Sequence, residues 1–376
     1  MTLSRCTLAR TLARVAGAGS AALTLALTAC VFSPYSIPVT SLDRPATEHG
    51  GADALTGPVS IAKQGSFFVG GHDIHSDTLS TSPKYDASGT VTVDQMYVHY
   101  QTPAGAKPVP VTLVHGCCLT GTSWETTPDG RMGWDEYFVR RGYSTYVIDQ
   151  SERGRSAASI GVINSVKLGK TAPSQLPSVF AASHEAAWTI FRFGPAYPQA
   201  WPGVQFPVEA QGELWKQMVP DWSGSLPTPN PTVPALSQLA IKLGRTVLVS
   251  HSQAGIYPFQ TAALSTRGVA GIVALEPAEC PSASADLTPY TKMPILLVFG
   301  DYIDQSPRWA PRLKACRSFA DATNHAGGQV KLLVLPDIGI HGNTHMMMQD
   351  RNNLEVADQV LQWIDTQVEQ ADRPAM

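Results

Sequence analysis

The sequence predicts an α/β protein with a mostly parallel central sheet. Short β-branched runs alternate with helical stretches through most of the 376-residue chain, which is the order of elements in that fold class. From Val109 onward most of the runs are apolar throughout, as expected of parallel strands that are buried on both faces. Hydrophobic residues make up 43% of the chain and charged residues 15%, a composition that supports a sizeable core and excludes a disordered protein.

The charge of the chain excludes some classes of partner. The formal net charge is −3, whereas a surface that binds nucleic acid is basic. No stretch of about 20 apolar residues is present, so the sequence predicts no membrane-spanning helix. His72, His75 and His99 do not have the spacing of metal ligands. We therefore expect neither a metal nor a cofactor.

The start of the chain is predicted to be an export signal. Three arginines precede an uncharged apolar run over 15–29, which is the pattern of a secretory signal peptide. The run ends in Leu27-Thr28-Ala29-Cys30 and resembles the lipobox of bacterial lipoproteins, in which the signal is cut before a cysteine that becomes lipidated. We expect a lipoprotein signal peptide over 1–29, a lipid anchor on Cys30 and a flexible tether over 30–57.

These features place the protein at the bacterial cell envelope, in the periplasm or at the outer membrane. An ordinary signal peptide with a chance cysteine is the alternative, and it would lead to a secreted protein.

The remaining residues, 58–376, form the predicted α/β domain. Strands are expected at 90–93 with 96–98, 109–114, 144–148, 246–249, 271–275, 295–299 and 331–335. Helices are expected at 133–141, 253–265, 308–326 and 353–370.

A long insertion interrupts this alternation at about 157–234. It is rich in Pro, Trp and Gly and has no strand pattern, and a structureless loop of that length in a compact domain is commonly a functional lid. A surface insertion without a function is the alternative. Its aromatic residues either line an apolar pocket or form the core of the insertion itself: Trp188, Phe191, Phe193, Trp201, Trp215 and Trp222.

The candidate nucleophile follows the strand at 246–249. This strand runs into Ser250-His251-Ser252-Gln253-Ala254-Gly255, and a helical pattern comes next. The segment resembles the nucleophile elbow of α/β-hydrolases, G-x-S-x-G, with Ser250 in place of the first glycine. The pattern predicts that Ser252 is a nucleophile at the amino end of a helix, where N–H groups favour negative charge.

The candidate oxyanion hole combines two backbone segments. The strand at 109–114 ends in His115-Gly116-Cys117-Cys118. In the hydrolase fold, the loop after the third strand and the residue after the nucleophile each supply one N–H to the oxyanion. We therefore expect Cys117 and Gln253 to be the two donors.

The cysteines are predicted to form two disulfides. Four of them lie beyond the predicted leader and its lipidated residue, and an oxidising compartment allows three connectivities. Cys280 with Cys316 is the natural long-range pair. Cys117 and Cys118 are neighbours, and the 3.8 Å between Cα atoms across a trans peptide is short of the usual disulfide range. Our hypothesis is a vicinal bridge that aims the Cys117 N–H; two buried free thiols are the alternative.

Two positions for the acid and two histidines compete for the rest of the site. Asp301 and Asp304 follow the seventh strand, which is the commonest position of the acid, whereas Glu276 directly follows the sixth strand and precedes a proline. The loop after the last strand contains both His341 and His345, and spacing does not choose between them. Three methionines follow at 346–348, and they either adapt to varied acyl groups or pack the last helix.

Several segments together resemble a small family of exported bacterial α/β-hydrolase esterases with a Ser-Glu-His triad. They are HGCCLTGTSWETTPDGRMGWDEYFVRRGY, VIDQSERGRS, VSHSQAGIYPFQTAAL, LEPAEC, FGDYID and IHGNTHMMMQDRNN. The resemblance covers about residues 60–365 and implies the α/β-hydrolase fold. It also implies the site residues: a triad of Ser252, Glu276 and His345, oxyanion donors at Cys117 and Gln253, and bridges Cys117–Cys118 and Cys280–Cys316.

The activity that the resemblance implies is serine carboxylesterase action on small to medium esters, in a protein that forms homodimers. A related branch of the family de-esterifies sulfonylurea herbicides. A lipase or polyester depolymerase would use the same triad, an amidase is a further alternative, and a hydrolase-fold binding lipoprotein without activity would lack a triad member.

Overall fold

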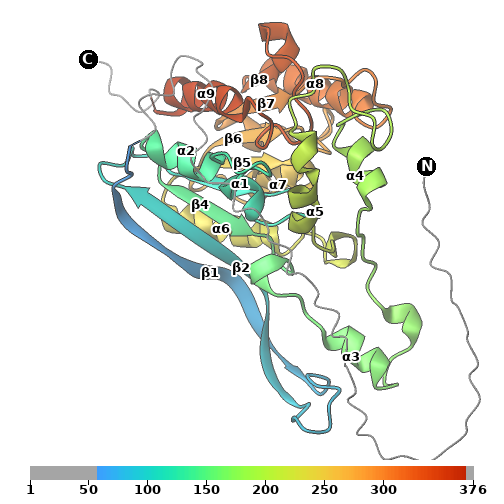
Figure 1. The fold of residues 1–376 in the computed structure, drawn as a ribbon. Helices are drawn as coiled ribbons and strands as arrows, with labels where there is room; N and C mark the ends of the chain where they lie inside the picture. The colour runs from blue at the N-terminus through green and yellow to red at the C-terminus, as the bar shows by residue number, and fades with distance from the viewer. Residues whose placement is uncertain (1–56, 370–376) are drawn as a thin grey trace, which may run out of the picture. The chain divides into compact units, whose positions relative to one another are not determined.

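The computed structural model describes residues 57–369, and a central eight-stranded sheet organises them (Figure 1). The strands are β1 (Ile61–Ser76), β2 (Gly89–Pro103), β3 (Val111–Val114), β4 (Thr145–Asp149), β5 (Thr246–His251), β6 (Val269–Leu275), β7 (Pro294–Phe299) and β8 (Gln329–Val334). Their order in the sheet is β1-β2-β4-β3-β5-β6-β7-β8. The predicted signal peptide, the predicted lipid anchor at Cys30 and nearly all of the predicted tether lie outside the described residues.

The sheet is parallel from β4 to β8 in its spatial order, and antiparallel only where β2 pairs with β1 and β4. This confirms the predicted α/β class with a mostly parallel sheet. Every residue of β3 and of β5 is buried, which agrees with the apolar runs from which parallel pairing was predicted. The carboxyl ends of these strands therefore meet at one edge, where loops can combine their side chains.

The α-helices lie between the strands and after the last of them. They are α1 (Thr122–Glu125), α2 (Trp134–Arg140), α3 (Gly161–Lys167), α4 (His184–Ile190), α5 (Gln211–Gln217), α6 (Thr232–Leu243), α7 (Tyr257–Leu264), α8 (Ala310–His325) and α9 (Asn353–Ile364). The predictions for α2, α7, α8 and α9 are confirmed. None of the described helices is long and apolar enough to cross a membrane.

Three parts of the chain differ from expectation. β1 was not predicted, because it is an edge strand on which most residues are exposed and several are glycines. α6 was not predicted either, because Pro231 and Pro234 suggest a loop, although the first turn of a helix tolerates proline. The expectation that 157–234 lacks secondary structure is wrong, since it contains α3, α4 and α5.

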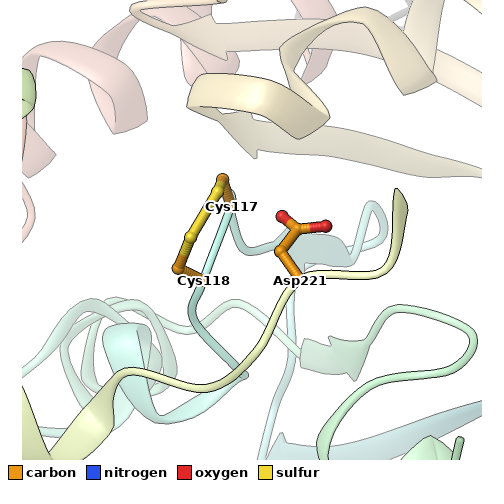
Figure 2. A group of neighbouring side chains, drawn as sticks. All are labelled: Cys117, Cys118 and Asp221. Atoms are coloured by element: carbon orange, nitrogen blue, oxygen red, sulfur yellow. A yellow bond between two sulfur atoms is a disulfide. The ribbon is translucent and has the colours of Figure 1, made fainter. Parts of the chain in front are cut away.

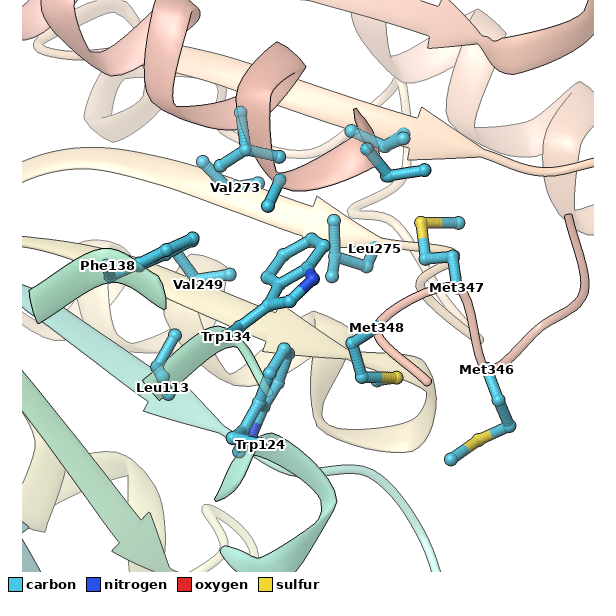
Figure 3. Packing of buried hydrophobic residues seen from close by; sticks show 14 of the residues in the cluster. Leu113, Trp124, Trp134, Phe138, Val249, Val273, Leu275, Met346, Met347 and Met348 are labelled. Carbon is cyan, nitrogen blue, oxygen red and sulfur yellow. The ribbon is translucent and has the colours of Figure 1, made fainter. Parts of the chain in front are cut away.

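The main hydrophobic core packs side chains of β3, β5 and β6 against α2 and the loop after β8 (Figure 3). Trp124 and Trp134 are both completely buried in it and lie 5.7 Å apart between ring centroids. Met346, Met347 and Met348 are also completely buried members of this cluster. The three methionines therefore pack the core at the point where the loop after β8 leads toward α9.

Candidate active site

Ser252 lies in the sharp turn between β5 and α7. A 3-10 segment, Ser252–Ile256, joins the strand to the helix. Ser252 has a φ angle of 59°, a left-handed conformation that residues other than glycine rarely adopt. At Gly255 a Cβ atom would lie 2.4 Å from the Cβ atom of Pro277, so a side chain there has no room. This crowding explains why the residues after Ser252 are small.

Ser252, His345 and Glu276 form a continuous hydrogen-bonded chain. Oγ of Ser252 lies 2.8 Å from Nε2 of His345, and Nδ1 of His345 lies 2.6 Å from Oε2 of Glu276. His345 and Glu276 are completely buried, and Ser252 is 7% exposed. Because a carboxylate only accepts hydrogen bonds, Nδ1 carries the ring proton and Nε2 is free to take the hydroxyl proton. The three side chains have the order of nucleophile, base and orienting acid.

The competing acids and histidine lie elsewhere. The carboxylate of Asp301 accepts the backbone N–H groups of Gly342, at 2.9 Å, and of Tyr302, at 2.7 Å. His341 has a side chain that is 67% exposed and lies 3.6 Å from Asp301. Asp304 is exposed. Asp301 therefore supports the loop that carries His345 and does not contact the imidazole of His345.

The loop after β3 passes directly beside the nucleophile. A Cβ atom on Gly116 would lie 2.7 Å from the Cβ atom of Ser252, so the backbone here approaches as closely as glycine allows. Among the described residues, the backbone N–H of Cys117 has no hydrogen-bond acceptor. The N–H of Gln253 lies in the first turn after Ser252, where helical N–H groups have no partner within the helix. Both candidate oxyanion donors thus flank Ser252.

Cys117 and Cys118 are joined through their sulfur atoms in the structure, beside the carboxylate of Asp221 (Figure 2). Their Cα atoms are 3.8 Å apart, and Cys118 has a φ angle of 60°. Asp221 pairs with Arg153 at 2.6 Å, and Arg153 donates to the carbonyl oxygen of Gly116 at 3.1 Å. A buried ion pair therefore connects the oxyanion loop to the insertion.

Among the described residues, the side chains of Cys117, Cys118 and Asp221 lie close enough together to hold a metal ion. A metal would need thiolates, whereas the two sulfurs are bonded to each other and the carboxylate already has a cationic partner. The cluster is thus better suited to fixing the loop than to binding a metal.

The loop that carries His345 is held by a second buried acid, Asp350. Its carboxylate accepts the backbone N–H and the hydroxyl of Thr344, at 2.7 and 2.8 Å, and the side-chain amide of Asn343 at 3.1 Å. Burial raises the pKa of Asp350 to about 7. These bonds fix the backbone immediately before His345.

Two other histidines near the site are structural. His251 donates from Nε2 to the backbone oxygen of His345 at 2.8 Å, and burial lowers the pKa of His251 well below its usual value. His115 accepts the backbone N–H of Gln150 at 3.0 Å, and burial together with Arg153 lowers its pKa to about 4. Both rings therefore stay neutral and support the backbone.

One residue that contacts the candidate triad, Arg192, was not predicted from the sequence. Its guanidinium donates to both carboxylate oxygens of Glu276, and both side chains are almost completely buried. Arg192 lies in the insertion, far from Glu276 in the sequence. No motif in the Phe191-Arg192-Phe193-Gly194 segment indicated that it reaches the sheet.

The electrostatics of the triad follow from this burial and these partners. Burial favours the neutral form of Glu276, but Arg192 and His345 outweigh burial and lower the pKa of Glu276 to about 2. Burial lowers the pKa of His345, and Glu276 opposes that shift. At neutral pH the site thus combines a carboxylate with a neutral imidazole, which is the state that can accept a proton from Ser252.

The remaining residues singled out in the sequence are the second cysteine pair and the aromatic residues of the insertion. Cys280 and Cys316 are joined with sulfur atoms 2.02 Å apart. Trp188, Phe191 and Phe193 are buried in the main core. Trp201 stacks on Tyr302 and Trp215 stacks on His184. Trp222 is half-buried, so the aromatic residues of the insertion are divided between the core and its surface.

Two comparisons identify related proteins. A solved structure described as a novel bacterial esterase is 65% identical to this chain; the match covers 86% of this chain and 100% of that one, with a TM-score of 0.82. A fungal protein named probable secreted lipase phiG is 28% identical to this chain, and the match covers 76% of this chain and 93% of that protein. No protein family model matches the chain.

Proposed function

Because this chain belongs to the esterase and lipase family of α/β-hydrolases and hydrolyses carboxylic esters, we propose that Ser252, His345 and Glu276 carry the reaction through an acyl-enzyme intermediate. The observation that supports this proposal best is the hydrogen-bonded chain from the Ser252 hydroxyl through the imidazole to the carboxylate. Its members come from three loops at the carboxyl edge of the sheet.

The proposed first step is an attack of Ser252 on the ester carbonyl. Nε2 of His345 takes the hydroxyl proton, and Glu276 stabilises the resulting imidazolium. The N–H groups of Cys117 and Gln253 receive the oxyanion, and each such donor contributes on the order of 3 kcal/mol in serine hydrolases. His345 then protonates the departing alcohol, and water releases the acid by the reverse sequence.

The decisive experiment is hydrolysis of p-nitrophenyl esters from acetyl to palmitoyl by the wild type and by Ser252→Ala. We expect activity to be highest on short acyl chains and to disappear in the variant. A maximum at long chains, above the solubility limit of the substrate, would favour the alternative of a lipase or polyester depolymerase, which the fungal relative's name suggests. Turnover that survives in Ser252→Ala would contradict the proposed nucleophile.

The natural ester is proposed to be a small molecule. Sulfonylurea herbicide esters belong in the substrate panel because a related branch of the family that the chain resembles de-esterifies such herbicides. Faster turnover of these bulky aromatic esters than of the short p-nitrophenyl esters would identify this substrate class.

Export and anchoring are also proposed, with the lipid on Cys30 and the protein at the cell envelope. A relative named as secreted supports export, and the lipobox pattern supports the anchor. Cys30→Ser should release the protein from the membrane fraction. The same fractionation of the wild type is the control, and wild-type protein that is entirely free would contradict the anchor.

The vicinal bridge between Cys117 and Cys118 is proposed to fix the oxyanion loop. Thiol titration of the denatured mature protein tests it, because both bridges together leave no free thiol among Cys117, Cys118, Cys280 and Cys316. Two or more titratable thiols would contradict the bridge. A homodimer is proposed as well, because the resemblance to the esterase family implies one.

A further inference from the structure

Arg192 contacts Glu276 in a geometry that determines the orientation of the carboxylate as well as neutralising its charge. Both terminal nitrogens of the guanidinium donate to the two oxygens of Glu276. Its Nε donates to the backbone oxygen of Asp301 at 3.0 Å, and its guanidinium carbon lies 5.6 Å from the centre of the Trp309 ring. An arginine that makes two parallel bonds to a carboxylate determines the plane of that carboxylate as well as its position. The backbone N–H of Gly300 donates to Oε1 of Glu276 at 2.7 Å and holds the same plane.

The backbone at Arg192 supports a specific role for this side chain. Arg192 has a φ angle of 58° and follows the last residues of α4. The N–H of Phe193 bonds the carbonyl of Trp188 at 3.0 Å, and the N–H of Arg192 bonds that of Thr189 at 3.3 Å. This is a Schellman ending, in which the left-handed position is usually glycine. An arginine in this unfavourable conformation indicates that the side chain is required there.

Phe191, which precedes Arg192, contacts His345, the other hydrogen-bond partner of Glu276. The backbone N–H of His345 donates to the carbonyl oxygen of Phe191 at 3.0 Å, and the Phe191 ring stacks on the imidazole with centroids 5.9 Å apart. Two consecutive residues at the end of one helix therefore contact the base and the acid of the site.

We propose that Arg192 is a positioning residue for ester hydrolysis: it fixes the carboxylate of Glu276 and, through it, the ring of His345. This inference rests on the proposed triad. It also implies that residues 190–193 stay in place during turnover, because moving them would separate the acid from its cation and release the backbone of His345.

The charges around the imidazole determine in which direction a substitution shifts the pKa of His345. Glu276 favours the imidazolium of His345, whereas Arg192 and Arg312 disfavour it. His251 faces the same ring, with centroids 4.4 Å apart, and burial keeps it neutral; Asp350 lies close enough to Glu276 to be influenced by its charge. Removing the charge of Arg192 should therefore raise the pKa of His345, and removing the charge of Glu276 should lower it.

The test compares pH profiles of kcat/KM for the wild type, Arg192→Met, Arg192→Lys and Glu276→Gln. In Arg192→Met we expect kcat to fall on the order of 10²-fold, less than the ~10⁴-fold typical of losing the acid's function. The acidic limb should move to higher pH in Arg192→Met and to lower pH in Glu276→Gln. Arg192→Lys keeps the charge without the paired bonds, so its limb should stay near that of the wild type while kcat recovers only in part.

Arg153→Met is the matched control, because Arg153 is also a buried arginine paired with a carboxylate, but on the oxyanion loop. It should leave the acidic limb in place whatever it does to kcat. If Arg192→Met does not fold, the fallback measurement is NMR of the wild type and of Arg192→Lys. It records the downfield signal of the proton on Nδ1 of His345. An unchanged signal in Arg192→Lys would contradict the positioning role of Arg192.

The inference is overturned if Arg192→Met leaves the acidic limb unmoved or changes KM alone. Its failure is distinct from failure of the triad. If Ser252→Ala and Glu276→Gln are inactive while Arg192→Met behaves like Arg153→Met, only the role of Arg192 is wrong. If Ser252→Ala remains active, the triad itself is wrong.

Discussion

Ser252, Glu276 and Arg192 have positive φ angles of 59°, 41° and 58°. For residues other than glycine such conformations cost on the order of 1–3 kcal/mol each, and they persist only where the surroundings enforce them. At these positions the surroundings are the crowded elbow and the buried ion pair. The elbow conformation could be predicted from the small residues around Ser252, whereas the other two could not, since they depend on contacts between distant segments.

At the residue scale, the first prediction separates the two candidate acids. Glu276→Gln should reduce kcat by about 10⁴-fold, because the amide cannot stabilise the imidazolium and favours the wrong tautomer. Asp304→Asn should have almost no effect, since Asp304 is exposed. Steady-state kinetics on p-nitrophenyl acetate measures both. The opposite ranking would make Glu276 a structural residue.

The second prediction concerns the pH dependence of the wild type. The acidic limb of kcat/KM reports the protonation of the essential base in the free enzyme. Burial lowers the pKa of His345 below its ordinary value of 6.5, so the base stays neutral and active as the pH falls through 6.5. We expect the midpoint of the limb below pH 6.5, from initial rates on an ester whose own hydrolysis is slow. A midpoint above that value would mean that Glu276 outweighs burial.

At the scale of elements, the strands were the most predictable part of the fold. The runs at 246–249 and 295–299 are buried on both faces, so every position except Thr246 is apolar. β1 has the opposite character, because its pairing is with β2 alone and most of its side chains face solvent. The insertion was least predictable, because its helices α4 and α5 are stabilised by packing against the core rather than by their own pattern.

The third prediction concerns the loop between β8 and α9. Asp350→Asn should place an NH2 group against at least one of the donors that now bind the carboxylate, and a buried unsatisfied donor costs about 1–3 kcal/mol. We expect a lower free energy of unfolding in urea and a kcat reduced about tenfold or more, because the backbone before His345 loses its support. Asp337→Asn, in the same region of the chain but exposed, is the control. Unchanged kcat in Asp350→Asn would show that the loop is held by its other contacts.

The fourth prediction concerns the pair that joins the loop after β6 to α8. Cys280 and Cys316 are 36 residues apart, and closing a loop of that length stabilises a protein by about 2–4 kcal/mol, mainly by restricting the unfolded chain. Cys280→Ala with Cys316→Ala should lower the urea midpoint accordingly. Reducing the wild type with dithiothreitol should produce the same shift, and no shift under either condition would show that the bridge does not form.

At the scale of the whole molecule, the insertion has two parts with different surroundings. Residues from α4 to α5 belong to the main core and contact the loop of His345. Residues 160–180, which we call the arm, rest on the turn between β1 and β2, where Thr78 and Gly161 bond at 3.0 Å (Figure 1). None of the residues 160–180 belongs to the main core.

The arm also carries an unusual amount of exposed apolar surface. Six of its large hydrophobic side chains are 39–50% exposed: Ile160, Val162, Leu168, Leu176, Val179 and Phe180. Its charged residues are both lysines, Lys167 and Lys170. Large exposed apolar patches generally mark interfaces, and we assign these exposed apolar side chains to the proposed homodimer.

The last prediction tests this surface. Leu176→Asp combined with Val179→Asp should convert a dimer to a monomer, because each buried carboxylate at an interface would lack a partner. Sedimentation equilibrium measures the mass, and the esterase rate on p-nitrophenyl acetate should stay close to that of the wild type, since the triad and its supports lie outside the arm. Leu264→Asp, which changes an apolar residue that is even more exposed and lies at the end of α7, should leave the mass unchanged. A wild type that sediments as a monomer would remove the dimer and leave a lipid surface as the partner to test, by binding of the arm variants to anionic vesicles.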